Sequence, residues 1–194
     1  MNYAEYVKMQ IDGEVIKPIH YHIGEWKAIN MFFEGYPRDA KILDVGCGIG
    51  YGVGIFKKLG FRDVVGIDLN PRKIELGKRL GYNIYQKDIM EFQPENFLFD
   101  AIWCSHAFEH MLDPDAVIEK MMDITTDDSR FLFILPYPDL YPSPIHCAAP
   151  LLGTNIDDHA ETVVGWFEDR GLLNVITRFD NFREPEVWLE FEKQ

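Results

Sequence analysis

Short apolar runs alternate with amphipathic stretches along most of the chain. The runs KILDV (41–45), DVVGI (63–67), NIYQK (83–87), FDAIWC (99–104) and FLFIL (131–135) have the length and composition of buried strands. Segments with helical periodicity lie between several of them. Strands that alternate with helices are typical of βαβ units, so the pattern predicts a parallel sheet covered by helices.

Capping residues indicate where several predicted helices begin. Asn70 and Asp113 each precede a proline, which favours a helix start because the side chain caps the first turn and proline is tolerated there. Asp158 and Glu161 have the spacing of a capping box, which predicts a helix from this point to Arg170.

The two ends of the chain show different patterns. Residues 22–34 carry apolar side chains at helical spacing, namely Ile23, Trp26, Ile29 and Phe33. Residues 186–193 alternate strictly, which predicts a half-exposed strand that forms an antiparallel hairpin with 173–179 at a sheet edge. Residues 136–156 contain five prolines and little periodicity, which indicates a long irregular loop of the kind that is often functional.

Length and composition indicate a single acidic domain. The chain has 194 residues, the length of one domain, and its 47% hydrophobic and 26% charged residues are close to the average composition of globular proteins. Its net charge of −13 repels phosphate backbones, so we expect no nucleic-acid partner. Three cysteines make a poor disulfide framework, and no apolar run resembles a signal sequence or a membrane span. We therefore expect a cytoplasmic protein without membrane association.

The strongest local motif is a glycine-rich turn between the first strand and the helix that follows it. Gly46, Gly48 and Gly50 allow a tight turn and close approach of the backbone to a ligand. Asp68 ends the next strand, about 20 residues on, where such folds place a carboxylate that binds ribose. The spacing is not the G-x-G-x-x-G of dinucleotide sites. Asp44 beside the turn suits a cationic ligand better than a pyrophosphate.

Five segments resemble the motifs of class I S-adenosylmethionine-dependent methyltransferases, in the same order and spacing. They are LDVGCGIG (43–50), VVGIDLNP (64–71), KDIMEF (87–92), FDAIWCSHAFEHMLDP (99–114) and FLFILPYP (131–138). The resemblance is closest to the small-molecule branch that includes the ubiquinone-biosynthesis methyltransferases. It implies S-adenosylmethionine as cofactor, S-adenosylhomocysteine as product and transfer of a methyl group.

The resemblance also implies a fold and a division of the chain. The fold would be an α/β Rossmann-like three-layer sandwich with a seven-stranded, mostly parallel sheet and an antiparallel C-terminal hairpin. Residues 1–194 would form one domain. Within it we expect a helical cap (1–35), a cofactor-binding core (40–138), a substrate loop and helix (136–172) and the hairpin (173–194).

By the same resemblance, Asp68 would bind the ribose hydroxyls, Asp88 the adenine amine, and the backbone N–H of Ile89 the adenine ring. Cys47 also has a simpler interpretation as a small buried residue. The full set of expected cofactor-binding residues is Asp44, Gly46, Cys47, Gly48, Gly50, Asp68, Leu69, Asp88, Ile89 and Ser105.

Two histidines are candidate general bases. Ligands of open α/β sheets lie at the carboxyl ends of the strands, and His106 and His146 follow the fourth and fifth predicted strands. Histidine titrates near neutral pH, which suits proton abstraction. A base is needed only if the methyl acceptor holds its proton tightly.

His106, Glu109 and His110 also spell H-x-x-E-H, the signature of one class of zinc proteases. That interpretation requires a long active-site helix, whereas the motif here follows a strand and Asp113-Pro114 restarts the chain just after it. Some methyltransferases that act on catechol-like substrates use a divalent ion near this place, which leaves Glu109 and His110 as possible ligands. We nevertheless expect no metal.

The acceptor is expected to be a small molecule, because the short chain has no separate recognition domain. A protein acceptor, or a protein that binds S-adenosylmethionine without catalysis, remains an alternative. The sequence does not identify the acceptor or the oligomeric state.

Overall fold

The computed structural model of the chain describes residues 2–12, 17, 19–140 and 143–194. Its helices are α1 (Tyr3–Asp12), α2 (Ile19–Phe32), α3 (Tyr51–Lys58), α4 (Pro71–Arg79), α5 (Pro114–Asp123), α6 (Ala149–Leu152) and α7 (Glu161–Glu168), with the short 3₁₀ helices η1 (Ile89–Glu91) and η2 (Phe108–His110). Its strands are β1 (Lys41–Val45), β2 (Asp63–Asp68), β3 (Ile84–Gln86), β4 (Phe99–Ser105), β5 (Thr125–Pro136), β6 (Leu172–Asp180) and β7 (Glu186–Lys193).

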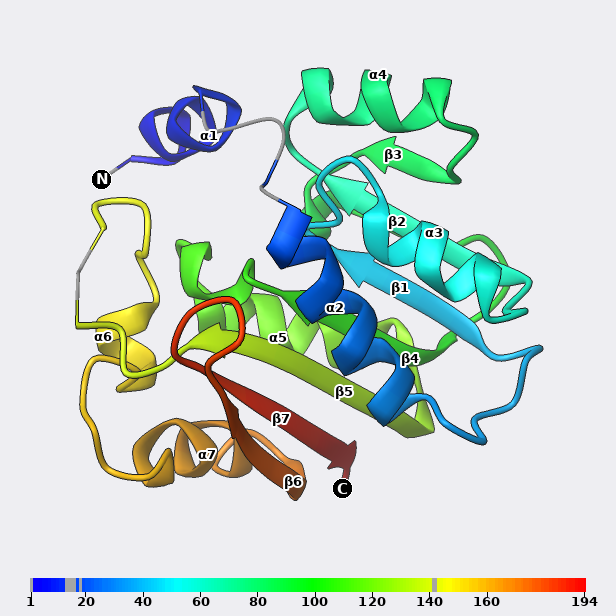
Figure 1. Cartoon of the computed structure of the whole chain (residues 1–194). Coiled ribbons are helices and arrows are strands. Elements are labelled where there is room, and N and C mark those ends of the chain that lie inside the picture. Colours follow the sequence, from blue (N-terminus) through cyan, green and yellow to red (C-terminus); the bar gives the residue numbers. More distant parts are fainter. Residues whose placement is uncertain (1, 13–16, 18, 141–142) are drawn as a thin grey trace.

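The seven strands form one sheet in the order β3-β2-β1-β4-β5-β7-β6 (Figure 1). Strands β1 to β5 are parallel, and β7 lies antiparallel to both β5 and β6. The predicted α/β three-layer architecture with an antiparallel C-terminal hairpin is therefore confirmed. The strand order reverses between β1 and β4, and a crevice for ligands opens at the carboxyl ends of the strands beside such a reversal.

Each face of the sheet is covered by helices and has its own apolar core. Ile29 of α2 and Phe56 of α3 pack against Trp103 on one face. On the other face, Ile118 of α5 and Phe167 of α7 belong to the second core. Figure 1 shows α2 and α3 in front of the sheet and α5 behind it. Because large side chains fill both faces, polar groups gather at the strand ends.

The exposure of the last strand differs from the prediction. The hairpin lies at the sheet edge as expected, but β6 forms that edge and β7 lies inside the sheet. Glu190 of β7, expected to face solvent, is 2% exposed and pairs with Arg130 of β5. A carboxylate paired with a guanidinium can be buried, and alternation of polar residues alone does not reveal such pairing.

The structure also corrects the details of two predicted helices and of the predicted loop 136–156. Helix α2 starts earlier than residue 22, and Ile23 and Trp26 lie outside its buried face. The segment 136–156 contains the short helix α6. Helix α7 ends before Arg170 and is capped by Ala160 in a left-handed conformation. The expected cap, Asp158, instead accepts a hydrogen bond from the N–H of Thr162 at 2.8 Å.

Within the described ranges, the helices are all too short or too polar to cross a bilayer. Residues 141 and 142 of the predicted substrate loop, and residues 1, 13–16 and 18 of the predicted cap, lie outside the described residues.

Helix α4 lies so close to the glycine-rich turn that its Gly77 has no room for a side chain. A Cβ atom at this position would lie 2.3 Å from the carbonyl oxygen of Ile49 and 2.3 Å from the Cδ1 atom of Ile84. Backbone atoms of the turn cannot yield as a flexible side chain can. The turn that contributes to the site is thus supported from behind by direct packing of α4.

We predict that Gly77→Ala destabilises the protein by about 1–3 kcal/mol, the usual cost of overpacking. The matched control is Gly165→Ala in α7, where a Cβ atom meets nothing within 4 Å. Alanine should stabilise that helix by about 0.5–1 kcal/mol. Urea unfolding measures both changes, and a stabilising Gly77→Ala would refute the close packing of α4.

Candidate functional site

The glycine-rich turn brings the backbone to the carboxyl end of the sheet. Gly46, Gly48 and Gly50 have φ angles of 73°, 56° and 86°, a region that residues with a Cβ atom rarely adopt. A Cβ atom on Gly46 would also lie 2.3 Å from the Cβ of Ala107, so the turn touches the segment after β4. The sequence prediction that glycine is required here is confirmed for the backbone.

Asp68 connects this turn to the next strand. Its Oδ2 accepts a hydrogen bond from the N–H of Gly48 at 2.9 Å, and its Oδ1 accepts one from the N–H of Asn70 at 2.7 Å. The carboxylate is half-buried at the end of β2. These two bonds hold the carboxylate in one orientation. Its place beside the turn is the one that the spacing of the sequence predicts.

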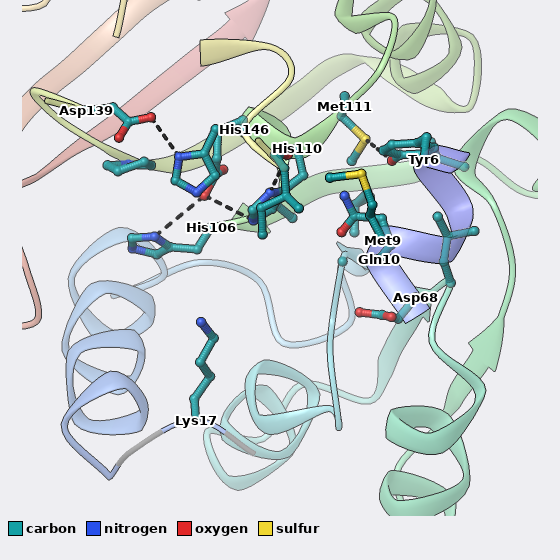
Figure 2. A pocket seen from close by; sticks show the side chains of 18 of the residues that line it. Tyr6, Met9, Gln10, Lys17, Asp68, His106, His110, Met111, Asp139 and His146 are labelled. Carbon is teal, nitrogen blue, oxygen red and sulfur yellow. Dashed lines mark hydrogen bonds and ion pairs between the residues drawn. The ribbon is translucent and has the colours of Figure 1, made fainter. Parts of the chain in front are cut away.

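A cavity of about 440 Å³ opens at the carboxyl ends of the parallel strands (Figure 2). Asp68 lies at one end of the view and His106 and His146 at the other, with Lys17 at the rim. Among the residues predicted to bind cofactor or to act as base, the following line this cavity: Gly46, Asp68, Leu69, Asp88, Ile89, His106 and His146.

The other predicted residues lie behind the wall or beside it. Gly48 and Gly50 shape the turn without lining the cavity, and Cys47 is buried against Gly66. Burial raises the pKa of the Cys47 thiol well above its usual value, so this residue is a packing residue. The hydroxyl of Ser105 lies 3.5 Å from the guanidinium of Arg183 and outside the cavity lining.

Asp44 is 2% exposed and its carboxylate turns beneath α3. A Cβ atom on Gly52 would lie 2.6 Å from Asp44 Oδ2 and 2.9 Å from Glu25 Oε1, so two carboxylates approach the same point. Burial and the neighbouring negative charge raise the pKa of Asp44. Asp44 Oδ2 has no hydrogen-bond partner among the described residues. This pair is an electronegative point next to the glycine-rich turn.

Helix α1 covers the cavity and contributes residues that we did not predict from the sequence. Tyr6, Met9 and Gln10 line the cavity from α1 at helical spacing. Asn70 holds the end of the helix, because its Nδ2 donates to the carbonyl oxygen of Ile11 at 2.9 Å. The spacing of the three lining residues was a signal in the sequence, but nothing in the sequence showed which surface this helix covers.

Tyr3 at the start of α1 donates a hydrogen bond to the carboxylate of Asp88. This bond, together with burial and the charge of Asp88, raises the pKa of the Tyr3 hydroxyl to about 12. Asp88 also caps η1 by accepting the N–H of Met90 at 2.9 Å. The helix is therefore attached to the cavity wall at both ends.

His106 lies between carboxylates that the sequence did not link to it. Its Nε2 is 2.8 Å from Glu186 Oε2, and its Nδ1 is 3.2 Å from Glu184 Oε1. Glu186 also accepts hydrogen bonds from Trp188 Nε1 at 2.6 Å and from Arg183. Burial lowers the pKa of His106, so the ring is mainly neutral near pH 7. Each ring nitrogen of His106 thus faces a carboxylate, and Glu186 is the nearer partner.

The second predicted histidine belongs to a different group. His146 Nδ1 lies 2.7 Å from Asp139 Oδ2, and the His146 ring is 4.9 Å from the ring of His110. Burial raises the pKa of the neighbouring Glu109 to about 8 and lowers that of His110 to about 4. The groups around the two histidines meet at Glu109, whose Oε1 lies 3.7 Å from His106 Nδ1 and 3.8 Å from His110 Nε2.

Comparison with known proteins supports one family. The family described as "Methyltransferase domain" matches residues 19–186. A ubiquinone biosynthesis O-methyltransferase of Colwellia psychrerythraea is 31% identical over 151 residues, which cover 69% of this chain and 61% of that protein. The corresponding enzyme of Neisseria meningitidis serogroup C is 27% identical, over 50% of this chain and 44% of its own. The chain thus spans less than two thirds of these relatives.

Solved structures share the fold at lower identity. A S-adenosylmethionine-dependent methyltransferase from Aquifex aeolicus superposes with a TM-score of 0.70 at 14% identity, over 100% of both chains. The plantazolicin methyltransferase BpumL, solved in complex with S-adenosylhomocysteine, gives a TM-score of 0.64 at 14% identity, covering 98% of this chain and 88% of that one.

The contact between Glu186 and His106 gives a prediction. Replacing Glu186 by glutamine removes a carboxylate that favours the protonated ring. The pKa of His106 should then fall further, because burial and the charge of Arg183 are opposed by Glu184 alone. Titration of the imidazole C–H signals by NMR measures the shift. Glu192→Gln, at the exposed end of the same strand, should leave this pKa unchanged, and a raised pKa in Glu186→Gln would contradict the assignment.

Proposed function

The chain belongs to the class I S-adenosylmethionine-dependent methyltransferases, and we propose that it transfers the methyl group of S-adenosylmethionine to a small molecule bound in the cavity at the strand ends. The observation that carries this proposal is the single cavity wall shared by Asp68, the glycine-rich turn and two histidines. S-adenosylhomocysteine would be the product.

The residues at the β1–β2 end fit the cofactor. The fixed carboxylate of Asp68 is placed to accept hydrogen bonds from ribose hydroxyls, as in related nucleotide-binding folds. Asp88, Ile89 and Leu69 line the same end, which suits an adenine ring. Gly46 lets the backbone approach the ligand, and the unpartnered oxygen of Asp44 favours a cationic amino group nearby.

The bound cofactor supplies an activated methyl group and a good leaving group for an in-line displacement. The protein then has to hold the acceptor in line, exclude water and remove a proton where the acceptor retains one. His106 is our candidate base, because its ring lines the cavity and Glu186 fixes the orientation of that ring. Glu184 and Glu186 would both stabilise the charged ring that forms. His146, oriented by Asp139, is the second candidate.

A small acceptor is favoured by the apolar part of the cavity lining. Met9, Met111, Leu140 and Ile145 contribute to it, and residues of α1 form one wall. An extended peptide would need an open groove. The net charge of −13 disfavours nucleic acid. We also propose a cytoplasmic location, in keeping with the free state of Cys47, Cys104 and Cys147.

The acceptor class can be tested by transferring a labelled methyl group from S-adenosylmethionine into an extract of the source cells. We expect the label in the low-mass fraction, insensitive to protease and nuclease. Label in protein would identify a protein methyltransferase instead. Binding of S-adenosylhomocysteine without transfer to any fraction would favour a protein that binds the cofactor without catalysis.

The cofactor assignment gives a second prediction. Asp68→Ala should weaken S-adenosylhomocysteine binding by about 1–3 kcal/mol, because polar groups of the ligand lose their partner. Isothermal titration calorimetry measures the change. Asp63→Ala is the control, since Asp63 is exposed at the opposite end of the same strand. Equal affinity in the two variants, with both folded, would exclude Asp68 as a ligand.

A further inference from the structure

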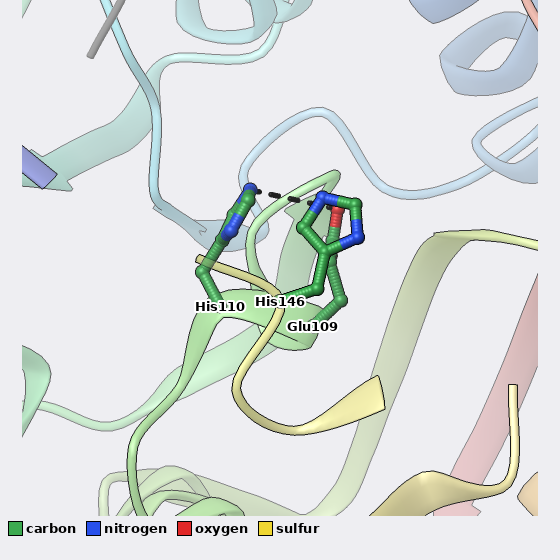
Figure 3. Close-up of side chains that lie close together, drawn as sticks. All are labelled: Glu109, His110 and His146. Atoms are coloured by element: carbon green, nitrogen blue, oxygen red, sulfur yellow. Dashed lines mark ion pairs between the residues drawn. The ribbon is translucent and has the colours of Figure 1, made fainter. Parts of the chain in front are cut away.

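Glu109, His110 and His146 meet at one end of the cavity, although they come from two separate segments. Glu109 and His110 lie in η2 after β4, and His146 lies in the loop after β5. One carboxylate oxygen and one ring nitrogen of each histidine lie within 4.8 Å of one another (Figure 3). All three residues line the cavity, at the end of the view in Figure 2 that lies away from Asp68.

Hydrogen bonds leave the Nε2 atom of both imidazoles as an acceptor. His110 Nδ1 lies 3.0 Å from the carbonyl oxygen of Ile145, which can only accept, so Nδ1 carries the proton. His146 Nδ1 lies 2.7 Å from Asp139 Oδ2, and a carboxylate at this place likewise favours a proton on Nδ1. When the rings are neutral, the lone pair is then on Nε2, which can only accept a hydrogen bond.

Glu109 adds a third, buried acceptor. The residue is 1% exposed, and its Oε2 has no hydrogen-bond partner among the described residues. Its Oε1 approaches His106 and His110 only to 3.7 Å and 3.8 Å, beyond a hydrogen bond. Within the described part of the chain, the ion-pair contacts of Glu109 are with these histidines alone, so no lysine or arginine side chain supplies its counter-charge. A carboxyl group buried in this way needs a proton or a cation.

We propose that Glu109, His110 and His146 bind a primary ammonium group of the methyl acceptor. An ammonium group has three N–H donors, no acceptor and one positive charge, which matches two imidazole nitrogens and one carboxylate. Three acceptors at about 2.9 Å from one nitrogen are roughly 4–5 Å apart, close to the spacing of this group. A hydroxyl group offers a single donor and would leave two of the three acceptors without a partner.

The ammonium group would serve recognition and not attack. A nitrogen that donates three hydrogen bonds has no lone pair, so the methyl group goes to another atom of the same acceptor. Leu140 and Ile145 line the same cavity, which suits an apolar body attached to the ammonium group. The inference rests on the proposed function only in naming the ligand as the methyl acceptor, because binding of an amine is measured without methyl transfer.

Three probes separate the N–H donors from the shape and the charge of the ligand: benzylamine, benzyl alcohol and benzyltrimethylammonium. Each is titrated by calorimetry into the full chain, with and without saturating S-adenosylhomocysteine. Phosphate buffer replaces Tris, which is itself a primary amine, and EDTA removes metal ions that bind amines. We expect one benzylamine per chain. Benzyl alcohol, which has no charge, and benzyltrimethylammonium, which has no N–H, should bind roughly 10–100-fold more weakly.

Glu109→Gln keeps the shape of the side chain and removes its charge. Its affinity for benzylamine should fall by roughly 10–100-fold, and its preference for benzylamine over benzyl alcohol should disappear. Glu192→Gln, at an exposed position of β7, is the matched control and should bind as the unaltered protein does. Thermal melting checks that both variants are folded.

No saturable binding of benzylamine in the presence of EDTA, or equal affinity for benzylamine and benzyl alcohol, would overturn the proposal. Unchanged affinity for benzylamine in folded Glu109→Gln would overturn it as well. Calorimetry with S-adenosylhomocysteine on the same samples reports separately on the cofactor site. If the cofactor does not bind but benzylamine still binds through Glu109, the ammonium site stands and the proposed function fails.

Discussion

The hydrogen bonds of one carboxylate, Asp68, connect the parts of the molecule on which the site depends. Its two oxygens hold the N–H of Gly48 in the turn after β1 and the N–H of Asn70 at the start of α4. Asn70 in turn caps α4 and holds the end of α1 through the carbonyl oxygen of Ile11. The turn, the second βα unit and the helix over the cavity are thus joined by short hydrogen bonds.

Burial of carboxylates in an acidic chain is the second constraint. Glu190 is neutralised by Arg130, and Glu186 by Arg183 together with hydrogen bonds from Trp188 and His106. Asp44, Glu109 and Glu190 each keep one buried carboxylate oxygen without a hydrogen-bond partner among the described residues. Asp44 and Glu109 lie near the carboxyl ends of the strands, and burial raises the pKa of both, so a proton can take the place of a counter-charge. For Asp44 we have proposed a cationic ligand group nearby.

The parts of the fold that follow from local sequence were predictable. The runs 41–45 and 63–67, the cap at Asn70 and the glycines of the turn depend on neighbouring residues, and the structure has them where expected. The hairpin at the sheet edge was predicted correctly, but the half-exposure of its last strand was predicted wrongly, because the pairing of Glu190 with the distant Arg130 leaves no local signal.

The site was predictable only where a motif marks it. Asp68, Asp88 and His106 were found in this way and line the cavity. Glu186 and Asp139 orient the two histidines but carry no local signal, since their roles arise from contacts made in the folded chain. The helical cap (1–35) was expected from the resemblance, but Tyr6, Met9 and Gln10 were not predicted as residues of the cavity wall.

The most direct test of the account is an experimental structure with S-adenosylhomocysteine bound. The ligand should lie in the cavity, with its ribose hydroxyls on Asp68 and its adenine between Leu69 and Ile89. Its sulfur should point towards the side where His106 lies. A ligand bound elsewhere, or one in the cavity without contact to Asp68, would contradict the central claim that this carboxylate and the glycine-rich turn form the cofactor site.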